Sequence, residues 1–155
     1  MKAAWVFVAA CWLGGGSAAL ACTPVAFGKF KVGQKVAQAR FAGIAGTCSP
    51  PGECTYNERS GIEYVVSQDT VVEVSAPVRL VRGLPTPPAR MDAAYARRAS
   101  AGRCQAFALK RDDGGDAYLE SAERVDPVSK EPVRVTIHRD ERGTPVVAIT
   151  SLPDN

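Results

Sequence analysis

The first 21 residues have the layout of an export signal, and this sets the conditions under which the rest of the chain folds. Lys2 is the only charged residue, an apolar run covers residues 3–13, and small residues fill 17–21. This order is typical of a secretory signal peptide. The apolar run is too short to cross a bilayer, which takes about 20 apolar residues. We therefore predict a signal peptide at 1–21 and a mature chain that begins at Cys22 and folds outside the cytoplasm.

Export makes disulfide bonds an option for the cysteines that follow the leader. These are Cys22, Cys48, Cys54 and Cys104, and four thiols allow three pairings. Cys48 and Cys54 flank a turn-forming Ser-Pro-Pro-Gly-Glu stretch, so we predict that these two form a disulfide. They have no histidine nearby, as a zinc site would need. We expect neither a metal nor a cofactor.

Cys22 has two possible fates. A cysteine directly after the cleavage site resembles the bacterial lipoprotein box, in which the thiol carries a lipid anchor, although that box prefers Leu where this chain has Ala19. Cys22 is therefore a lipidation candidate. The alternative is that it pairs with Cys104 in a soluble mature protein. The expected locations are the periplasm, the outer membrane through a lipid anchor, or, third, the medium after secretion.

The first half of the mature chain predicts both strands and a helix. Residues 25–32 have strand-like composition, and 34–44 carry apolar side chains on one helical face. Residues 62–67 and 70–76 alternate polar with apolar, and the two residues between them predict a β-hairpin. A loop over 48–56 and a further strand over 77–82 complete this half.

A proline-rich stretch at 83–88 resembles a linker, and the second half repeats the order of the first. A helix is predicted from Pro88 to about Ala101. Strands are expected at 105–109, 118–125, 133–138 and 145–150. A gapless overlay places 45–48 on 101–104, cysteine on cysteine. The predicted fold class is α+β, with two tandem small modules, 22–82 and 89–155, each a short helix packed on an antiparallel sheet.

The run Val32-Gly33-Gln34-Lys35-Val36, the Cys48–Cys54 loop and the hairpin from Ile62 resemble the BamE family of small outer-membrane assembly lipoproteins. Two such modules in tandem are also similar to the secreted β-lactamase inhibitory proteins, in which each module carries a small disulfide. The resemblance implies a fold and the binding of another protein. It carries over no site residue, and Cys104 has no near partner that would give the second module its own bridge.

Charge is distributed unevenly along the chain. The formal net charge is only +3. Between residues 79 and 111 Asp92 is the only acid among eight basic residues, whereas 112–126 are strongly acidic. The two blocks can be solvated faces that partly neutralise each other, or the basic block can bind an anionic partner. Aromatic residues do not interleave with the basic ones as base-stacking platforms would, so we expect no nucleic-acid partner.

The residues that could support catalysis are few. His138 is the only histidine, and the alternation over 133–138 places it on the polar face of a strand. No nucleophile elbow and no His-Glu-x-x-His motif is present. The carboxylates of 112–116 lack the spacing of a calcium loop, so a hairpin turn is expected there.

The sequence therefore predicts a non-catalytic, exported bacterial cell-envelope protein that binds another macromolecule. The partner would be a protein or an anionic envelope component. The candidate binding residues are Tyr95, Arg90, Arg97, Arg98 and Arg103, because tyrosine and arginine are frequent anchors of interfaces. The Pro50-Pro51-Gly52 loop is a second surface. The alternative function is an exported envelope hydrolase with His138 as general base.

Overall fold

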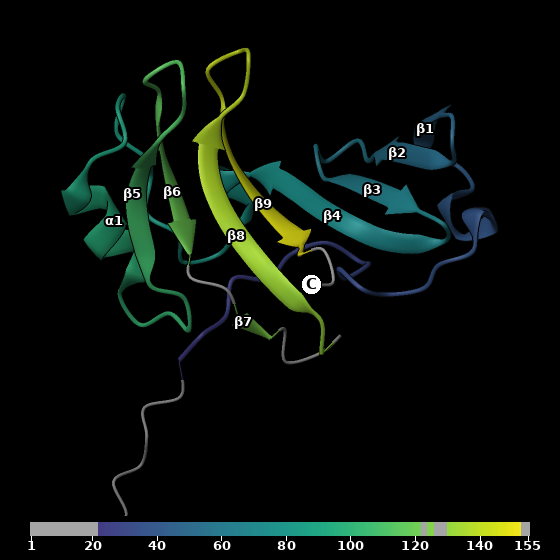
Figure 1. Ribbon diagram of the computed structural model, residues 1–155, viewed down its shortest axis with the longest axis horizontal. Helices are drawn as coiled ribbons and strands as arrows, with labels where there is room; N and C mark the ends of the chain where they lie inside the picture. The colour runs from purple at the N-terminus through teal and green to yellow at the C-terminus, as the bar shows by residue number, and fades with distance from the viewer. Residues whose placement is uncertain (1–21, 122–123, 126–129, 153–155) are drawn as a thin grey trace, which may run out of the picture.

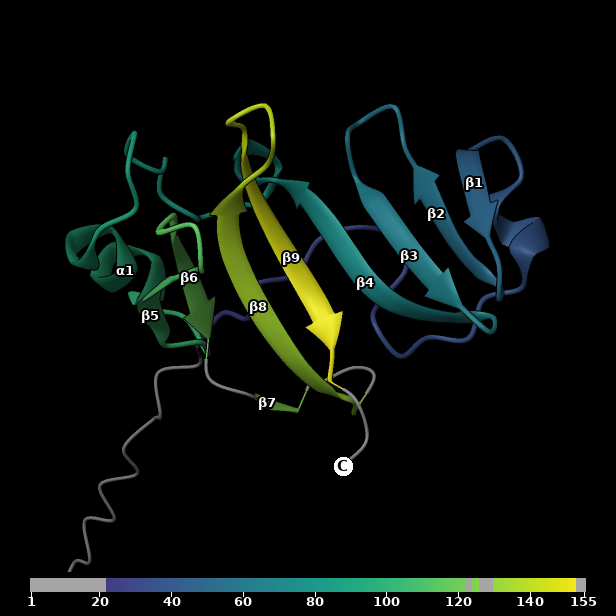
Figure 2. The same cartoon turned by 45° about the horizontal axis from the view of Figure 1, so that its top comes forward.

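The computed structural model describes residues 22–121, 124–125 and 130–152, so the predicted signal peptide lies outside the described residues. Its strands form one antiparallel sheet (Figures 1 and 2). They are β1 (Ala45–Ser49), β2 (Glu53–Asn57), β3 (Glu63–Ser67), β4 (Thr70–Pro77), β5 (Phe107–Arg111), β6 (Ala117–Ser121), β7 (Arg124–Val125), β8 (Pro132–Arg139) and β9 (Pro145–Ser151). The other regular elements of the described residues are two 3-10 turns, η1 (Gln38–Phe41) and η2 (Val78–Leu80), and one helix, α1 (Ala93–Ser100).

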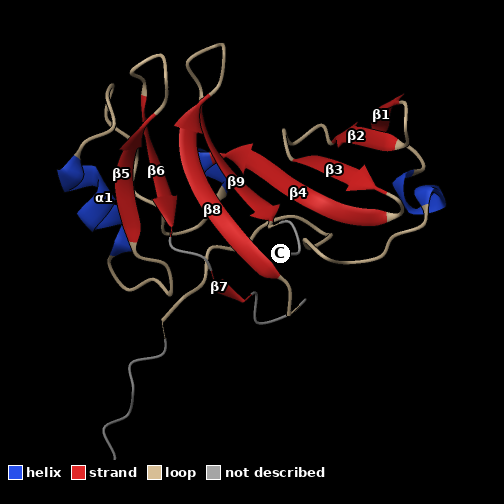
Figure 3. Cartoon of the chain, in the orientation of Figure 1, coloured by secondary structure: helices blue, strands red, loops and turns tan. Residues whose placement is uncertain are grey.

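The spatial order of the strands is β1-β2-β3-β4-β9-β8-β6-β5, and β7 pairs with β8. The last strands of the two halves pair with each other, from Glu73 opposite Thr150 to Pro77 opposite Val146. The predicted fold class of two helix-on-sheet modules is therefore wrong. Within the described residues the protein is mainly β, with one sheet that spans both halves and a single α-helix (Figure 3).

The helix predicted over 34–44 is only the four-residue turn η1. The start of this segment pairs with the β3–β4 hairpin instead: the Val36 N–H donates to the Asp69 carbonyl, and the Val71 N–H donates to that of Gln34. These bonds hold 34–36 extended. Ala37, at the N-cap of η1, offers no side-chain oxygen for the free N–H groups.

The second predicted helix forms but begins later than Pro88. The Asp92 carboxylate accepts a hydrogen bond from the Tyr95 N–H at 2.6 Å, so Asp92 is the N-cap of α1. Tyr95, Ala96 and Ala99 form the buried face of the helix. A side-chain cap next to a repeating apolar face fixes the start of a helix more firmly than a preceding proline does.

The predicted β3–β4 hairpin is confirmed. Its two turn residues, Gln68 and Asp69, both have positive φ angles, as a tight type I′ turn requires. The strand expected at 25–32 forms no strand, although Val25, Phe30 and Val32 are buried against the sheet. In place of the strand expected at 77–82, residues 78–80 form η2.

The core covers one face of the sheet. Side chains alternate between buried and half-exposed along β3, β4 and β8, so each strand turns one set of residues into the core. The N-terminal segment, drawn purple in Figure 1, crosses behind the sheet, and α1 lies beside β5. At one end of the core the ring of Phe41 stacks on that of Tyr56, with centroids 4.0 Å apart.

Two disulfides join the four cysteines of the described chain. Cys48 pairs with Cys54, its direct neighbour across β1 and β2, as predicted. Cys22 pairs with Cys104 and so ties the N-terminal segment of the described chain to the loop before β5. The disulfides indicate a location outside the cytoplasm. Cys48 lies within β1, whereas Cys104 lies in the loop before β5, so the sequence overlay does not align equivalent positions.

A sulfur atom in a disulfide cannot also carry a thioether-linked lipid. The Cys22–Cys104 bond and lipidation of Cys22 therefore exclude each other. The backbone reinforces the bond, because the Thr23 N–H donates to the Gly102 carbonyl and the Cys104 N–H donates to that of Thr23. None of the described helices is long and apolar enough to cross a membrane.

Candidate functional site

No helix among the described residues covers the sheet face opposite the core, and we call this face the open face (Figure 3). Its side chains are mostly half-exposed and polar. They include Thr55, Glu63, Glu73, Ser75, Tyr118, Glu120, Arg134, Thr136, His138 and Thr150. The two central strands contribute small side chains, among them Ser75 and Ala148, which are direct cross-strand neighbours.

The sheet splits near one end. The β6–β8 ladder contains only two pairs, Leu119 with Ile137 and Glu120 with Thr136. Each strand continues beyond this ladder with its outer neighbour: β5–β6 pairing extends to Ala117, and β8–β9 pairing extends to Arg139. The β5–β6 and β8–β9 hairpins therefore diverge toward their tips, which lie side by side at the top of Figure 1. We call this end of the sheet the loop end.

The two hairpin tips have the same local chemistry. Each begins with Arg-Asp and continues to a glycine, as Arg111-Asp112-x-x-Gly115 and Arg139-Asp140-x-x-Gly143. In each, the glycine has a positive φ angle and its N–H donates to the aspartate carbonyl. In each, the arginine Nη1 donates to the glycine carbonyl.

The aspartate side chains complete these turns. Asp112 Oδ1 accepts from the Asp116 N–H at 2.8 Å, and Asp140 Oδ1 accepts from the Thr144 N–H at 2.8 Å. The predicted hairpin turn at 112–116 is confirmed. Within the described residues, no group of three or more His, Cys, Asp or Glu side chains could hold a metal ion.

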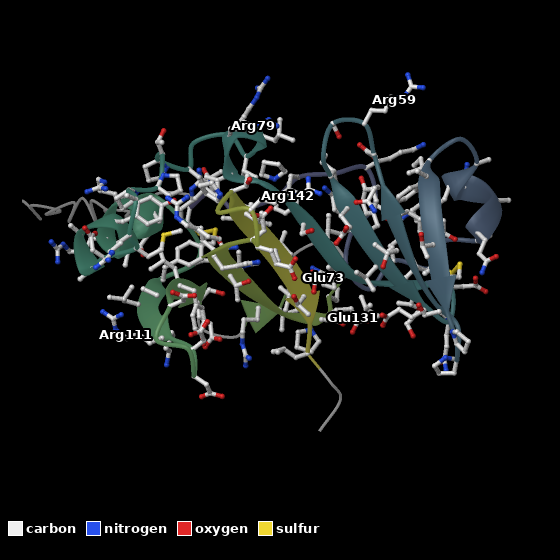
Figure 4. All side chains as sticks on the ribbon, turned by 90° about the horizontal axis from the view of Figure 1, so that it is seen from above. Arg59, Glu73, Arg79, Arg111, Glu131 and Arg142 are labelled. Atoms are coloured by element: carbon white, nitrogen blue, oxygen red, sulfur yellow. A yellow bond between two sulfur atoms is a disulfide. The ribbon has the colours of Figure 1, made fainter. Side chains whose placement is uncertain are left out.

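A cleft of about 910 Å³ lies between the two hairpins, with residues 89–91 as its third wall. Its lining mixes polar and apolar side chains, and the charged ones carry both signs. The charged and titratable residues are Arg90, Arg111, Asp112, Asp116, His138, Arg139, Asp140 and Glu141. Tyr118 and Thr136 add hydroxyl groups from the open face. Figure 4 looks onto the loop end and labels Arg111 and Arg142, one from each hairpin.

Arg139 joins two walls of the cleft. Its guanidinium donates to the carbonyl of Gly143 in the β8–β9 turn and to that of Pro88 in the proline-rich loop. Its Nε is buried and has no partner among the described residues. The guanidinium therefore fixes the position of the proline-rich loop relative to the sheet.

His138 lies on the polar face of β8, as the alternation predicted, and it lines the cleft. Its ring makes no hydrogen bond to another described residue, so nothing described orients it. Two strands away, burial raises the pKa of Glu73, and the hydrogen bond from Thr150 and the nearby His138 oppose this rise. The lining contains several carboxylates but no Ser or Cys among the described residues.

The predicted binding residues do not gather in one site. Arg90 is exposed and lines the cleft, whereas Arg97 lines a shallow hollow between α1 and β5. Arg98 lies over the ring of Tyr95, 5.7 Å from its centroid. Arg103 Nη2 donates to the Arg82 carbonyl at the proline-rich loop.

Tyr95 is fully buried, so it is not available to contact a partner. Its hydroxyl donates to the Pro85 carbonyl at 3.0 Å, and burial raises its pKa to about 12. It anchors the proline-rich loop to α1. The sequence reasoning missed the cleft, although the twofold Arg-Asp-x-x-Gly pattern could have indicated two hairpins of the same kind.

Comparison with known proteins gives no relative: no protein-family model, no curated protein and no solved structure matches the chain. The resemblance to the BamE family stays a prediction.

Proposed function

We propose that this protein is an exported, non-catalytic binding protein that receives a loop or extended segment of another protein in the cleft at its loop end. The observation that carries the proposal is the early end of the β6–β8 ladder. It leaves residues 117–118 of β6 and 138–139 of β8 without strand partners across the cleft. Backbone groups of this kind can pair with a segment that enters between them.

The chemistry of the lining favours a protein partner over a small molecule. Small-molecule sites are mostly apolar, with a few polar groups. This cleft is lined by charges of both signs, and it also contains Tyr118 and exposed arginines such as Arg90. Tyrosine and arginine are the side chains most often found at the energetic centres of protein interfaces.

We further propose the periplasm as the location of a soluble mature protein. The support is the Cys22–Cys104 disulfide, which uses the sulfur that a lipid anchor would need. Mass spectrometry of the mature chain tests this, because an N-terminal Cys22 without acyl chains is expected. A mass that includes acyl chains would place the protein at a membrane.

Crosslinking and capture from intact envelopes test the binding proposal. The cleft variant carries Arg90→Glu and Tyr118→Ala. The matched variant carries Arg97→Glu and Arg98→Glu on α1, outside the cleft. We expect the cleft variant to lose its captured protein at least about tenfold, as for loss of interface anchors, while the α1 variant retains it. Circular dichroism melting checks that both variants fold.

Two outcomes would reject the cleft. If only the α1 variant loses capture, the binding surface is the arginine set predicted from sequence and not the cleft. If neither variant loses capture, the cleft is not the binding site.

A hydrolase is the second candidate function, because His138 shares the cleft with several carboxylates. A general base must be held within hydrogen-bond reach of its proton donor. No described hydrogen bond orients the ring, which favours binding over catalysis. A panel of ester, amide and glycoside substrates assayed with wild type and His138→Ala tests this. A turnover that the variant abolishes would establish the enzyme.

A further inference from the structure

A third hollow lies beside the cleft and is separate from the one between α1 and β5; we call it the groove. It has a volume of about 520 Å³ and is lined by residues of β4, η2, the proline-rich loop and the start of β9. The apolar lining residues that matter here are Pro77, Val78, Leu84, Pro87 and Pro145. Leu80, on η2, is one of two large hydrophobic side chains exposed in the described residues.

The charges at the groove have one sign. Arg79 and Arg82 both line it and both are exposed, and no described carboxylate lines it. Of the acids nearest in sequence to the lining, Glu141 lines the cleft and Glu73 accepts a hydrogen bond from Thr150 on the open face; neither lines the groove. Figure 4 shows Arg79 at the loop end, on a segment neighbouring the one that bears Arg142.

The groove and the cleft share a wall. Gly143 lines the cleft, and the next two residues, Thr144 and Pro145, line the groove. On the other side Pro87 lines the groove and Ala89 lines the cleft. Arg139 lies between them, because its guanidinium contacts the carbonyls of both segments. A segment that leaves the cleft over this ridge therefore enters the groove.

We infer that the groove binds an extended protein segment that carries apolar side chains together with carboxylates. The inference rests on the proposed function and names the chemistry of its partner. Apolar side chains of the segment would contact the prolines and Leu84. Its carboxylates would pair with Arg79 and Arg82, whose planar guanidinium groups bind carboxylates in a bidentate manner.

Fluorescence anisotropy with synthetic peptides tests the inference on the mature, oxidised chain. The probe is a labelled ten-residue peptide that alternates Leu with Glu. Comparison peptides replace Glu by Lys or Leu by Ser. The groove variant carries Arg79→Glu and Arg82→Glu, and its matched control carries Lys35→Glu and Arg40→Glu, two exposed cations outside the groove.

The Leu-Glu peptide should bind wild type and the matched control equally, within about twofold, and bind the groove variant at least about tenfold more weakly. Both comparison peptides should bind weakly to wild type and to the matched control, and the Lys peptide should bind the groove variant more tightly than it binds wild type, because that variant reverses the charge of the groove. The inference is overturned if the Leu-Glu peptide does not bind wild type at about 1 mM, if the Lys peptide binds as well, or if the matched control loses as much affinity. Phosphatidylglycerol vesicles that displace the bound peptide would instead assign the groove to a lipid surface.

The same groove variant, used for capture from envelopes, separates this inference from the proposed function. Loss of capture by the cleft variant with normal capture by the groove variant would retain the proposed function and reject the groove. Normal capture by both variants would reject the proposed function itself, whatever the peptides do.

Discussion

Glu73 lies on the open face next to the centre of the sheet, and its burial there changes the free energy of ionising its carboxyl group. Thr150 Oγ1 donates to its Oε2 at 3.3 Å. Burial raises the pKa of Glu73 above 4.5, and the hydrogen bond opposes this rise. The native state therefore holds a proton on Glu73 more tightly than the unfolded state does.

This shift predicts a pH effect of definite sign. Above about pH 4.5 the unfolded chain releases the proton of Glu73 before the native chain does, so ionisation costs stability as the pH rises through the raised pKa. Glu73→Gln should therefore become more stable relative to wild type from pH 4.5 toward neutrality. Denaturant unfolding across this range measures it.

Thr150→Val is the companion variant. It removes the hydrogen bond that lowers the pKa of Glu73. The stability of this variant should therefore fall over a wider pH range than the stability of wild type does. Parallel stability profiles for Glu73→Gln and wild type would contradict this account of the carboxylate.

Tyr64 connects three separate segments at the opposite, covered face. Its hydroxyl accepts from the Lys29 N–H at 2.8 Å and donates to Glu58 Oε1 at 2.9 Å. Tyr64→Phe should lower the free energy of unfolding by about 1–3 kcal/mol, because it leaves the Lys29 N–H unpaired. Tyr56→Phe is the control, since the Tyr56 hydroxyl makes no described hydrogen bond, and it should cost less than about 0.5 kcal/mol. Equal losses in urea titrations would refute the role of the Tyr64 hydroxyl.

At the scale of elements, the hairpin tips define the shape of the cleft. Asp140 Oδ1 accepts from the N–H groups of both Arg142 and Thr144 and so holds the β8–β9 turn in one conformation. The glycine that follows contributes the left-handed backbone that the turn needs. The β8–β9 turn is therefore held in shape by bonds within the turn itself.

Asp140→Ala should cost about 1 kcal/mol in unfolding free energy, because two exposed turn bonds are lost. Glu141→Ala, in the same turn, makes no described bond and should cost less than about 0.5 kcal/mol. Hydrogen exchange of the Thr144 N–H should accelerate in the first variant only. Unchanged exchange in Asp140→Ala would mean that other contacts hold the turn.

The sequence predicted most strands but not their assembly, and the reasons are physical. Alternation along Glu63–Ser67 and Pro132–Arg139 is a local property and could be recognised. Pairing of β4 with β9 joins residues that are far apart in the chain, and no local pattern encodes it. The segment 34–44 has helical periodicity, but tertiary hydrogen bonds to the β3–β4 hairpin overrule it.

The candidate site was harder to predict for the same reason. The binding residues were chosen from a run of arginines, yet Tyr95 is in the core and the arginines lie on separate surfaces. The cleft arises where the β6–β8 ladder ends. No local sequence pattern in either strand indicates where their pairing stops.

At the scale of the whole molecule, the β4–β9 ladder makes one folding unit of the two halves. Five residue pairs connect them through the centre of the sheet. The Cys22–Cys104 bond adds a covalent link between the start of the described chain and the second half. Each half therefore contributes strands to one sheet, and neither half forms that sheet without the other.

The mature chain should therefore unfold in one cooperative transition. Differential scanning calorimetry of the oxidised protein should give a ratio of calorimetric to van't Hoff enthalpy of about 1. Near-ultraviolet and far-ultraviolet circular dichroism should report the same midpoint. Two resolved transitions would mean that the halves are independent modules, as the sequence first suggested.

The central claim is that a partner protein binds in the cleft between the two Arg-Asp-x-x-Gly hairpins. Photocrosslinking in intact envelopes, with p-benzoylphenylalanine in place of Tyr118, tests it most directly, because Tyr118 lines the cleft and is half-exposed. The same group in place of Arg40, on η1, is the control. We predict a discrete crosslinked protein from position 118 and none from position 40. No crosslink from position 118, or the same product from both positions, would contradict the claim.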